Sequence, residues 1–210
     1  WDSAAAGLVA EALAARATEL EVSLPRYLST SAVMALNSDP DTWALNALRP
    51  MPRPPVRASR VGEQFHAWLE RRFGASMPLD FEEDDQSGAG SGLEELIEAF
   101  QRGVFADRVP SVVEIPFSLV LGRQVVRGRI DAVYTDGDRP LVVDWKTGRR
   151  RPDPLQLAIY RLAWAEISGL QPQQVDASFY DVLSGRLHRP DDLPGRAELE
   201  ELVSGLSGLG

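Results

Sequence analysis

Three apolar segments rich in β-branched residues follow one another in the middle of the chain. They run from Val112 to Leu121, from Val125 to Tyr134 and from Leu141 to Trp145. Gly122-Arg123 separates the first two and Asp136-Gly137-Asp138 the last two, and such short connections are typical of β-hairpins. The pattern predicts two successive hairpins, which together make a three-stranded antiparallel meander.

A helix and a further strand are predicted after the meander. Residues 154–167 begin with Pro154 and carry apolar residues at helical spacing, whereas residues 175–183 have the composition of a strand. Strands and helices in this order form an α/β layered fold. We therefore expect a mixed β-sheet, made of the antiparallel meander plus one further strand, flanked by helices.

Helical patterns also occur before the meander and at both ends of the chain. We expect a peripheral helix within residues 1–27, a main domain over residues 28–190, and a tail or last helix of the same domain over residues 191–210. Between residue 28 and the meander, the pattern predicts four helices and one acidic, glycine-rich loop. The helices cover residues 29–36, 39–48, 61–73 and 93–101, and the loop covers residues 80–92.

Composition removes several classes of site. The 210 residues contain no cysteine, which excludes thiol nucleophiles and cysteine-held zinc or iron–sulfur centres, so a metal must be bound by His, Asp or Glu. The longest apolar stretches are interrupted by Glu11 and Arg161, so we expect no membrane span. The net charge of −9 argues against indiscriminate coating of nucleic acid.

Asp144 and Lys146 lie two residues apart near the end of the third segment, so strand alternation places both side chains on one face. Antiparallel pairing could set Asp131, from the neighbouring strand, beside Asp144. Two carboxylates and one ammonium suit a hard divalent cation and a phosphate under attack. An Asp–Lys pair at this spacing can also be a plain surface ion pair. Because Lys146 is the only lysine among 22 basic residues, the catalytic interpretation is favoured.

Four further residues could serve the same site. His66 follows Gly62 by one helical turn and could supply a nitrogen ligand, although a lone helical histidine is more often a packing residue. Gln156 and Tyr160 lie four apart on one helical face, so both could reach the site or simply form a polar helix edge. Glu114 could add another acid, but the alternation along its strand leaves its face undecided.

In this order and at these distances, the motifs Gly62-x-x-x-His66, Gly128-x-x-Asp131, Asp144-Trp145-Lys146-Thr147-Gly148 and Gln156-x-x-x-Tyr160 resemble the nuclease domain of the RecB family, within the PD-(D/E)xK superfamily. The resemblance covers roughly residues 28–185. The segments LPRYLSTSAVMAL, LRPMPRPP and DASFYDVLSGRLHRP are similar to the carboxy-terminal nuclease domains of actinobacterial helicase-nucleases.

The resemblance implies a metal-dependent deoxyribonuclease, of exonuclease type, that hydrolyses phosphodiester bonds in single-stranded DNA. In such an enzyme, Mg²⁺ or Mn²⁺ is bound by His66, Asp131, Asp144 and the backbone carbonyl of Trp145. Lys146 orients the attacking water, and Gln156 and Tyr160 position the water or the DNA strand. Several relatives contain a four-cysteine iron–sulfur cluster, which this chain cannot form.

Residues 49–60 carry four prolines and four arginines and no acidic residue. We expect an extended, positively charged strap there. The strap arginines that could contact the DNA backbone are Arg49, Arg53, Arg57 and Arg60.

The resemblance also predicts partners and a setting. We expect a helicase motor in the same full-length chain, a possible second helicase-nuclease subunit, a role in processing DNA double-strand breaks, no membrane association and a cytoplasmic location. The chain begins at Trp1 without a signal-like segment, which favours a piece of a longer protein. Two alternatives remain: a catalytically silent DNA-binding domain, and a stand-alone or CRISPR-associated nuclease of the same superfamily.

Overall fold

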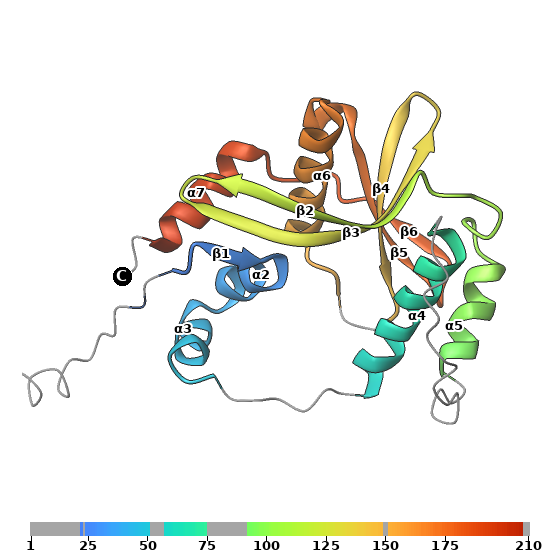
Figure 1. The fold of residues 1–210 in the computed structure, drawn as a ribbon, viewed down its shortest axis with the longest axis horizontal. Coiled ribbons are helices and arrows are strands. Elements are labelled where there is room, and N and C mark those ends of the chain that lie inside the picture. Colours follow the sequence, from blue (N-terminus) through green and yellow to red (C-terminus); the bar gives the residue numbers. More distant parts are fainter. Residues whose placement is uncertain (1–21, 23, 51–56, 75–91, 149–150, 208–210) are drawn as a thin grey trace, which may run out of the picture.

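A computed structural model of the chain describes residues 22, 24–50, 57–74, 92–148 and 151–207. A six-stranded mixed sheet forms its centre, with helices on both faces (Figure 1). The strands are β1 (Tyr27–Ser29), β2 (Val112–Leu121), β3 (Gln124–Asp136), β4 (Arg139–Lys146), β5 (Asp176–Asp181) and β6 (Arg186–His188). The α-helices are α2 (Thr30–Ser38), α3 (Pro40–Leu48), α4 (Arg57–Phe73), α5 (Gly92–Gln101), α6 (Pro154–Ser168) and α7 (Arg196–Ser207).

The long strand β3 organises the sheet. β2 pairs antiparallel with β3 along one edge, from the Leu121–Gln124 pair to the Val112–Val133 pair. The other edge of β3 is shared by two strands: β1 pairs parallel with residues 125–127, and β4 pairs antiparallel with residues 132–136. Residues 128–131 therefore lie between β1 and β4 without a strand partner on that edge.

The outer strands complete the mixed sheet. β4 pairs parallel with β5 from Leu141 to Lys146, and β5 pairs antiparallel with β6. A parallel pair needs a crossover between its strands, and α6 provides it. This helix begins at the N-cap Asp153 and ends at Gly169, which adopts the left-handed conformation that glycine tolerates.

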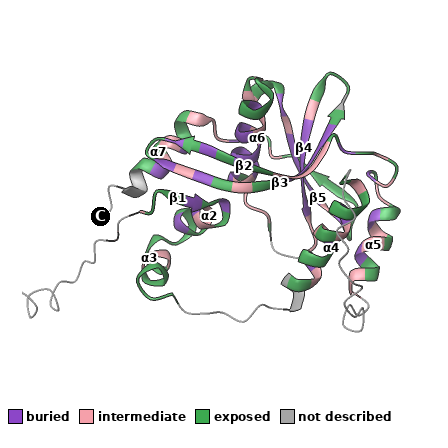
Figure 2. Cartoon of the chain, viewed as in Figure 1, coloured by how far each residue is buried: buried purple, intermediate pink, exposed green. Residues whose placement is uncertain are grey.

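Two hydrophobic clusters cover the two faces of the sheet. The first joins α2, α6 and α7 to residues such as Phe117, Leu119 and Val126. The second joins α4 and α5 to residues such as Val143 and Trp145 on β4. The buried positions in Figure 2 follow these two clusters on either side of the strands.

The structure confirms the predicted meander, the further strand and the flanking helices, with Ser29 and Asp39 as the N-caps of α2 and α3. The short strands β1 and β6 were not predicted. The predicted strap over residues 49–60 is wrong at its end, because α4 begins at Arg57 and includes Arg60. The predicted helix within residues 1–27 and the loop over residues 80–92 lie almost wholly outside the described residues. Within the described ranges, no helix is long and apolar enough to cross a bilayer.

Candidate functional site

The site lies where β3 and β4 separate. Their ladder ends at the Ala132–Val143 pair, although β4 continues beside β5 as far as Lys146. The backbone N–H of Trp145 instead donates a hydrogen bond to the Asp131 carboxylate, with 2.8 Å between the nitrogen and Oδ2. A side chain thus replaces the missing strand-to-strand bond and keeps a buried backbone donor satisfied.

Glu114 reaches the same opening from β2 through an unusual backbone conformation. Its φ of 48° lies in the left-handed region, which a residue with a Cβ seldom adopts. The flanking residues Val113 and Ile115 pack against opposite hydrophobic clusters, so the regular two-residue alternation is broken at this point. This local twist explains why alternation could not predict the face on which Glu114 lies.

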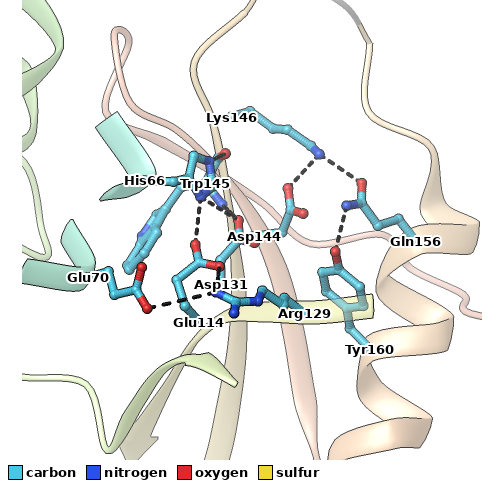
Figure 3. A network of polar contacts seen from close by, with 10 residues as sticks. All are labelled: His66, Glu70, Glu114, Arg129, Asp131, Asp144, Trp145, Lys146, Gln156 and Tyr160. Carbon is cyan, nitrogen blue, oxygen red and sulfur yellow. Dashed lines mark hydrogen bonds and ion pairs between the residues drawn. The ribbon is translucent and has the colours of Figure 1, made fainter. Parts of the chain in front are cut away.

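His66 projects from α4 into the opening and joins the acids (Figure 3). Its Nδ1 lies 3.0 Å from Glu114 Oε1 and 3.7 Å from Asp131 Oδ2. Its Nε2 lies 3.2 Å from the carbonyl oxygen of Trp145. Gly62, one turn earlier, leaves room for Thr147: a Cβ at position 62 would lie 2.8 Å from Thr147 Oγ1. The absence of a side chain at Gly62 therefore lets α4 approach the end of β4.

Burial and mutual repulsion govern the charges of this cluster. Burial raises the pKa of Asp131 well above its usual range, and the negative charge of Asp144 raises it further. Burial likewise raises the pKa of Asp144, although Lys146 opposes this shift. For His66, burial alone would lower the pKa, but the hydrogen bond to Glu114 and the nearby carboxylates raise it to about 9. Three acids this close favour the binding of positive charge.

A second set of contacts extends from Asp144 to α6. Lys146 Nζ lies 2.7 Å from Asp144 Oδ2 and donates a hydrogen bond of 2.7 Å to Gln156 Oε1. The Gln156 amide then donates to the Tyr160 hydroxyl oxygen at 3.0 Å. Figure 3 shows this row of side chains running from the end of β4 to α6.

The donor set fits a divalent metal ion. One ligand atom each from His66, Glu114 and Asp131 lies within 4.8 Å of the others, and one nitrogen with two carboxylate oxygens suits Mn²⁺ or Mg²⁺. Asp144, which is 1% exposed and paired through Oδ2 with Lys146, lies beside this set. These observations add Glu114 to the expected ligands.

Two pockets flank the cluster. The first, of about 520 Å³, is lined by His66, Glu114, Arg129 and Asp131. The second, of about 640 Å³, is lined by Lys146, Gln156 and residues of α2. His66 and Thr147 line both pockets, so the cluster is accessible from the two sides.

The structure brings the predicted catalytic and metal-binding residues together at the end of β4 (Figure 3). Arg49 is an exposed C-cap residue after α3, and Arg60 is exposed on α4. Arg53 and the side chain of Arg57 lie outside the described residues. Glu114 was considered as a further acid but its face was left open, and the signal for it was a single acid within the apolar run Val112-Val113-Glu114-Ile115.

Comparison with known proteins agrees with this fold. The family model for the PD-(D/E)XK nuclease superfamily matches residues 27–204. The fold is similar to that of a candidate exonuclease from Eubacterium rectale, with a TM-score of 0.56 and 14% identity over 87% of this chain and 78% of that chain. The structure of SSO0001 aligns with a TM-score of 0.44 and 13% identity over 90% of this chain and 79% of that chain. No curated protein matches the chain in sequence.

Proposed function

The chain belongs to the PD-(D/E)XK nuclease superfamily, and from this premise we propose that it is a metal-dependent deoxyribonuclease that hydrolyses phosphodiester bonds in single-stranded DNA. The observation that carries the proposal is the cluster of His66, Glu114 and Asp131 beside the Asp144–Lys146 pair. The His66 nitrogen and the carboxylates of Glu114 and Asp131 can bind the cation. The adjacent Lys146 ammonium does not bind a cation and can contact the phosphate instead.

In this proposal each residue has a chemical task. His66, Glu114 and Asp131 hold the metal, with Asp144 and the Trp145 carbonyl as further ligand candidates. When bound, Mg²⁺ or Mn²⁺ supplies Lewis-acid stabilisation of the charge that develops on the phosphate. Lys146 orients the attacking water and neutralises the phosphate charge. Gln156 holds the ammonium at its position through the 2.7 Å hydrogen bond, and Tyr160 holds the Gln156 amide.

We further propose that the domain is part of a helicase-nuclease of the actinobacterial AdnAB type, corresponding to its AdnB subunit. The support is the similarity of three sequence segments, of which 24–36 and 176–190 lie on described elements. The proposal implies a cytoplasmic protein with a motor in the full-length chain that delivers single-stranded DNA during double-strand break repair and recombination. The name of the Eubacterium rectale neighbour is compatible with exonuclease action.

The direct experiment is incubation of the purified protein with labelled single-stranded DNA and either Mn²⁺ or Mg²⁺. We expect cleavage that a chelator abolishes, and no cleavage by the Asp144→Asn variant under the same conditions. Arg186→Gln, which changes an exposed residue on β6, is the matched control and should cleave like the wild type. Absence of cleavage with any divalent metal would favour a catalytically silent DNA-binding domain instead.

A further inference from the structure

One face of the β2–β3 hairpin and of β1 stays uncovered in the described part of the chain. The opposite face is buried in the first hydrophobic cluster through Phe117, Leu119 and Val126. Along β2, burial alternates regularly from Pro116 onward, and buried and exposed positions follow one another along both strands in Figure 2. We define the hairpin face by its exposed or half-buried residues, which are Tyr27, Ser29, Pro116, Ser118, Val120, Val125, Arg127 and Arg129.

The charged residues of the hairpin face are all positive. It contains two arginines and no acidic residue, and exposed Arg26 stands next to Tyr27 at its edge. The whole chain has a net charge of −9, so a patch without acids departs from the rest of the molecule. Such a patch attracts a polyanion through local charge even though the protein is acidic overall.

The spacing of these groups suits an extended chain of phosphates. Arg127 and Arg129 are two residues apart on one strand, so their backbone positions are separated by about 6.6 Å. This spacing is comparable to the distance between successive phosphates in an extended single strand. Strand register also places Ser29 and Ser118 on either side of Arg127, and serine hydroxyls commonly bind phosphate oxygens. The Ser29 oxygen also caps α2 by accepting from the Ala32 N–H, which leaves its own O–H as the donor.

Tyr27 adds an aromatic surface to the hairpin face. The residue is 50% exposed, so its ring is open to a ligand. The Arg127 guanidinium lies over the ring, 4.0 Å from its centroid, and the Arg26 guanidinium lies at 5.8 Å. A ring held beside cations is the arrangement on which unpaired bases stack while their phosphates contact arginine. A double helix would not present its bases to this ring.

The hairpin face leads directly into the candidate site. Arg129 lines the 520 Å³ pocket together with His66 and Asp131. Its guanidinium lies 3.9 Å from Glu114 and 3.8 Å from Glu70, so it marks the border between the arginines and the acids (Figure 3). A strand that crosses Tyr27 and Arg127 therefore reaches the metal-binding cluster by passing Arg129.

We propose that the hairpin face binds the backbone and one or more unpaired bases of single-stranded DNA and guides the strand toward His66 and Asp131. This inference rests on the proposed function and assigns the path of its substrate. It names Arg26, Tyr27 and Arg127 as binding residues outside the pocket, separate from the expected strap.

The test measures the binding of labelled oligothymidylate by fluorescence anisotropy, in EDTA so that no cleavage occurs, over a series of NaCl concentrations. The Arg26→Gln/Arg127→Gln double variant should bind more weakly, and the slope of log affinity against log salt should fall by about 0.7 for each lost phosphate contact. Tyr27→Ala should weaken binding about fivefold or more at every salt concentration, with an unchanged slope, because stacking involves no counterion release.

Three controls make the outcome decisive. Arg127→Lys keeps the charge and should keep the slope, and Arg186→Gln on β6 should bind like the wild type. Thermal unfolding confirms that each variant is folded.

Unchanged slopes in the double variant, together with Mn²⁺-dependent cleavage by the wild type, would overturn the hairpin face alone. Absence of both binding and cleavage in the wild type would instead overturn the proposed function. The same titration with labelled duplex DNA tests the assignment of unpaired bases. If Tyr27→Ala weakened duplex binding as much as it weakens oligothymidylate binding, that assignment would be overturned.

Discussion

Lys146 is held between two neighbours, the Asp144 carboxylate and the Gln156 amide, with its Nζ 2.7 Å from each partner oxygen. We expect Lys146→Ala to lower the rate of DNA cleavage about a hundredfold or more, because a charge aimed at the phosphate is lost. The fold should survive, since the pKa of buried Asp144 is already raised and its carboxyl can take up a proton. Single-turnover cleavage and thermal unfolding measure the two effects.

Lys146→Arg is the matched variant, and it should also be poorly active. The planar guanidinium is wider than the ammonium and cannot occupy the position between Asp144 and Gln156 in the same way. Full activity of this variant would remove the inference drawn from the chain's only lysine. Loss of cooperative unfolding in Lys146→Ala would point to a structural role.

Asp131 has two partners, the backbone N–H of Trp145 and the metal that we assign to the cluster. Asp131→Asn keeps an oxygen for the Trp145 N–H but removes the negative charge, so the sheet should stay intact while Mn²⁺ binds more weakly. Asp131→Ala should lose both the acceptor for the Trp145 N–H and the charge that binds Mn²⁺. Calorimetric titration with Mn²⁺ checks this prediction, and equal affinity in the wild type and Asp131→Ala would show that Asp131 is no ligand.

His66 should make metal binding depend on pH. Its pKa is raised to about 9, so the metal-free protein carries an imidazolium at neutral pH. Mn²⁺ must displace that proton, and its affinity should therefore rise with pH, by up to about tenfold per pH unit for each proton released, until His66 titrates. Asp131 acts in the same direction because burial raises the pKa of its carboxyl, so that a proton also competes with the metal there. Titrations of the wild type and His66→Ala at several pH values measure the effect, which should be smaller in the variant.

At the scale of elements, the contribution of the strap arginines to DNA binding can be measured separately from that of the hairpin face. The part of the strap that is helical, from Arg57, exposes Arg60, and Arg49 is exposed after α3. If residues 49–60 contact DNA, neutralising Arg49, Arg53, Arg57 and Arg60 should weaken binding and lower the salt slope by about 0.7 per lost contact. The same anisotropy assay checks this prediction, and an unchanged slope would mean that these arginines make no phosphate contact.

The longer elements were predictable because their signals are local. Asp39 and Pro40 mark the start of α3, and the turn at Gly122, with a φ of 57°, marks the end of β2. The short strands β1 and β6 contain three residues each. The pairing of β1 depends on a partner far along the chain, since Tyr27 pairs with Val125. β6 pairs with the adjacent strand β5, but all three of its residues are exposed, so it carries no apolar alternation. Neither strand has a pattern long enough to be read from its own sequence.

The candidate site shows the same division. The two-residue spacing of Asp144 and Lys146 and the four-residue spacing of Gln156 and Tyr160 predict that each pair shares one face, as the structure shows. The contact between the two pairs, from Lys146 to Gln156, was left open by the sequence. Glu114 was left undecided because its position depends on a backbone twist that alternation does not describe. The pairing of Asp131 with the Trp145 N–H was also unpredictable, since it arises where β3 and β4 separate.

At the scale of the whole molecule, the site lies at the edge of both hydrophobic clusters. His66 comes from α4, which packs in the second cluster, whereas Tyr160 belongs to the first cluster on the other face of the sheet. The two layers can meet there only because β3 and β4 separate and β2 twists. The functional residues therefore depend on an irregularity in a sheet that is otherwise regular.

The left-handed backbone of Glu114 implies a trade-off between stability and activity. In most strands alanine stabilises more than glycine, by about 0.5–1 kcal/mol. Here the order should reverse, because glycine adopts this φ without a steric cost. The free energy of unfolding of Glu114→Gly should be about 1 kcal/mol higher than that of Glu114→Ala, so Glu114→Gly should unfold at a higher denaturant concentration. Both variants lack the carboxylate and should cleave DNA poorly. A Glu114→Ala variant as stable as Glu114→Gly would contradict this view. The expected order would mean that natural selection has kept a locally unfavourable residue for the reaction it serves.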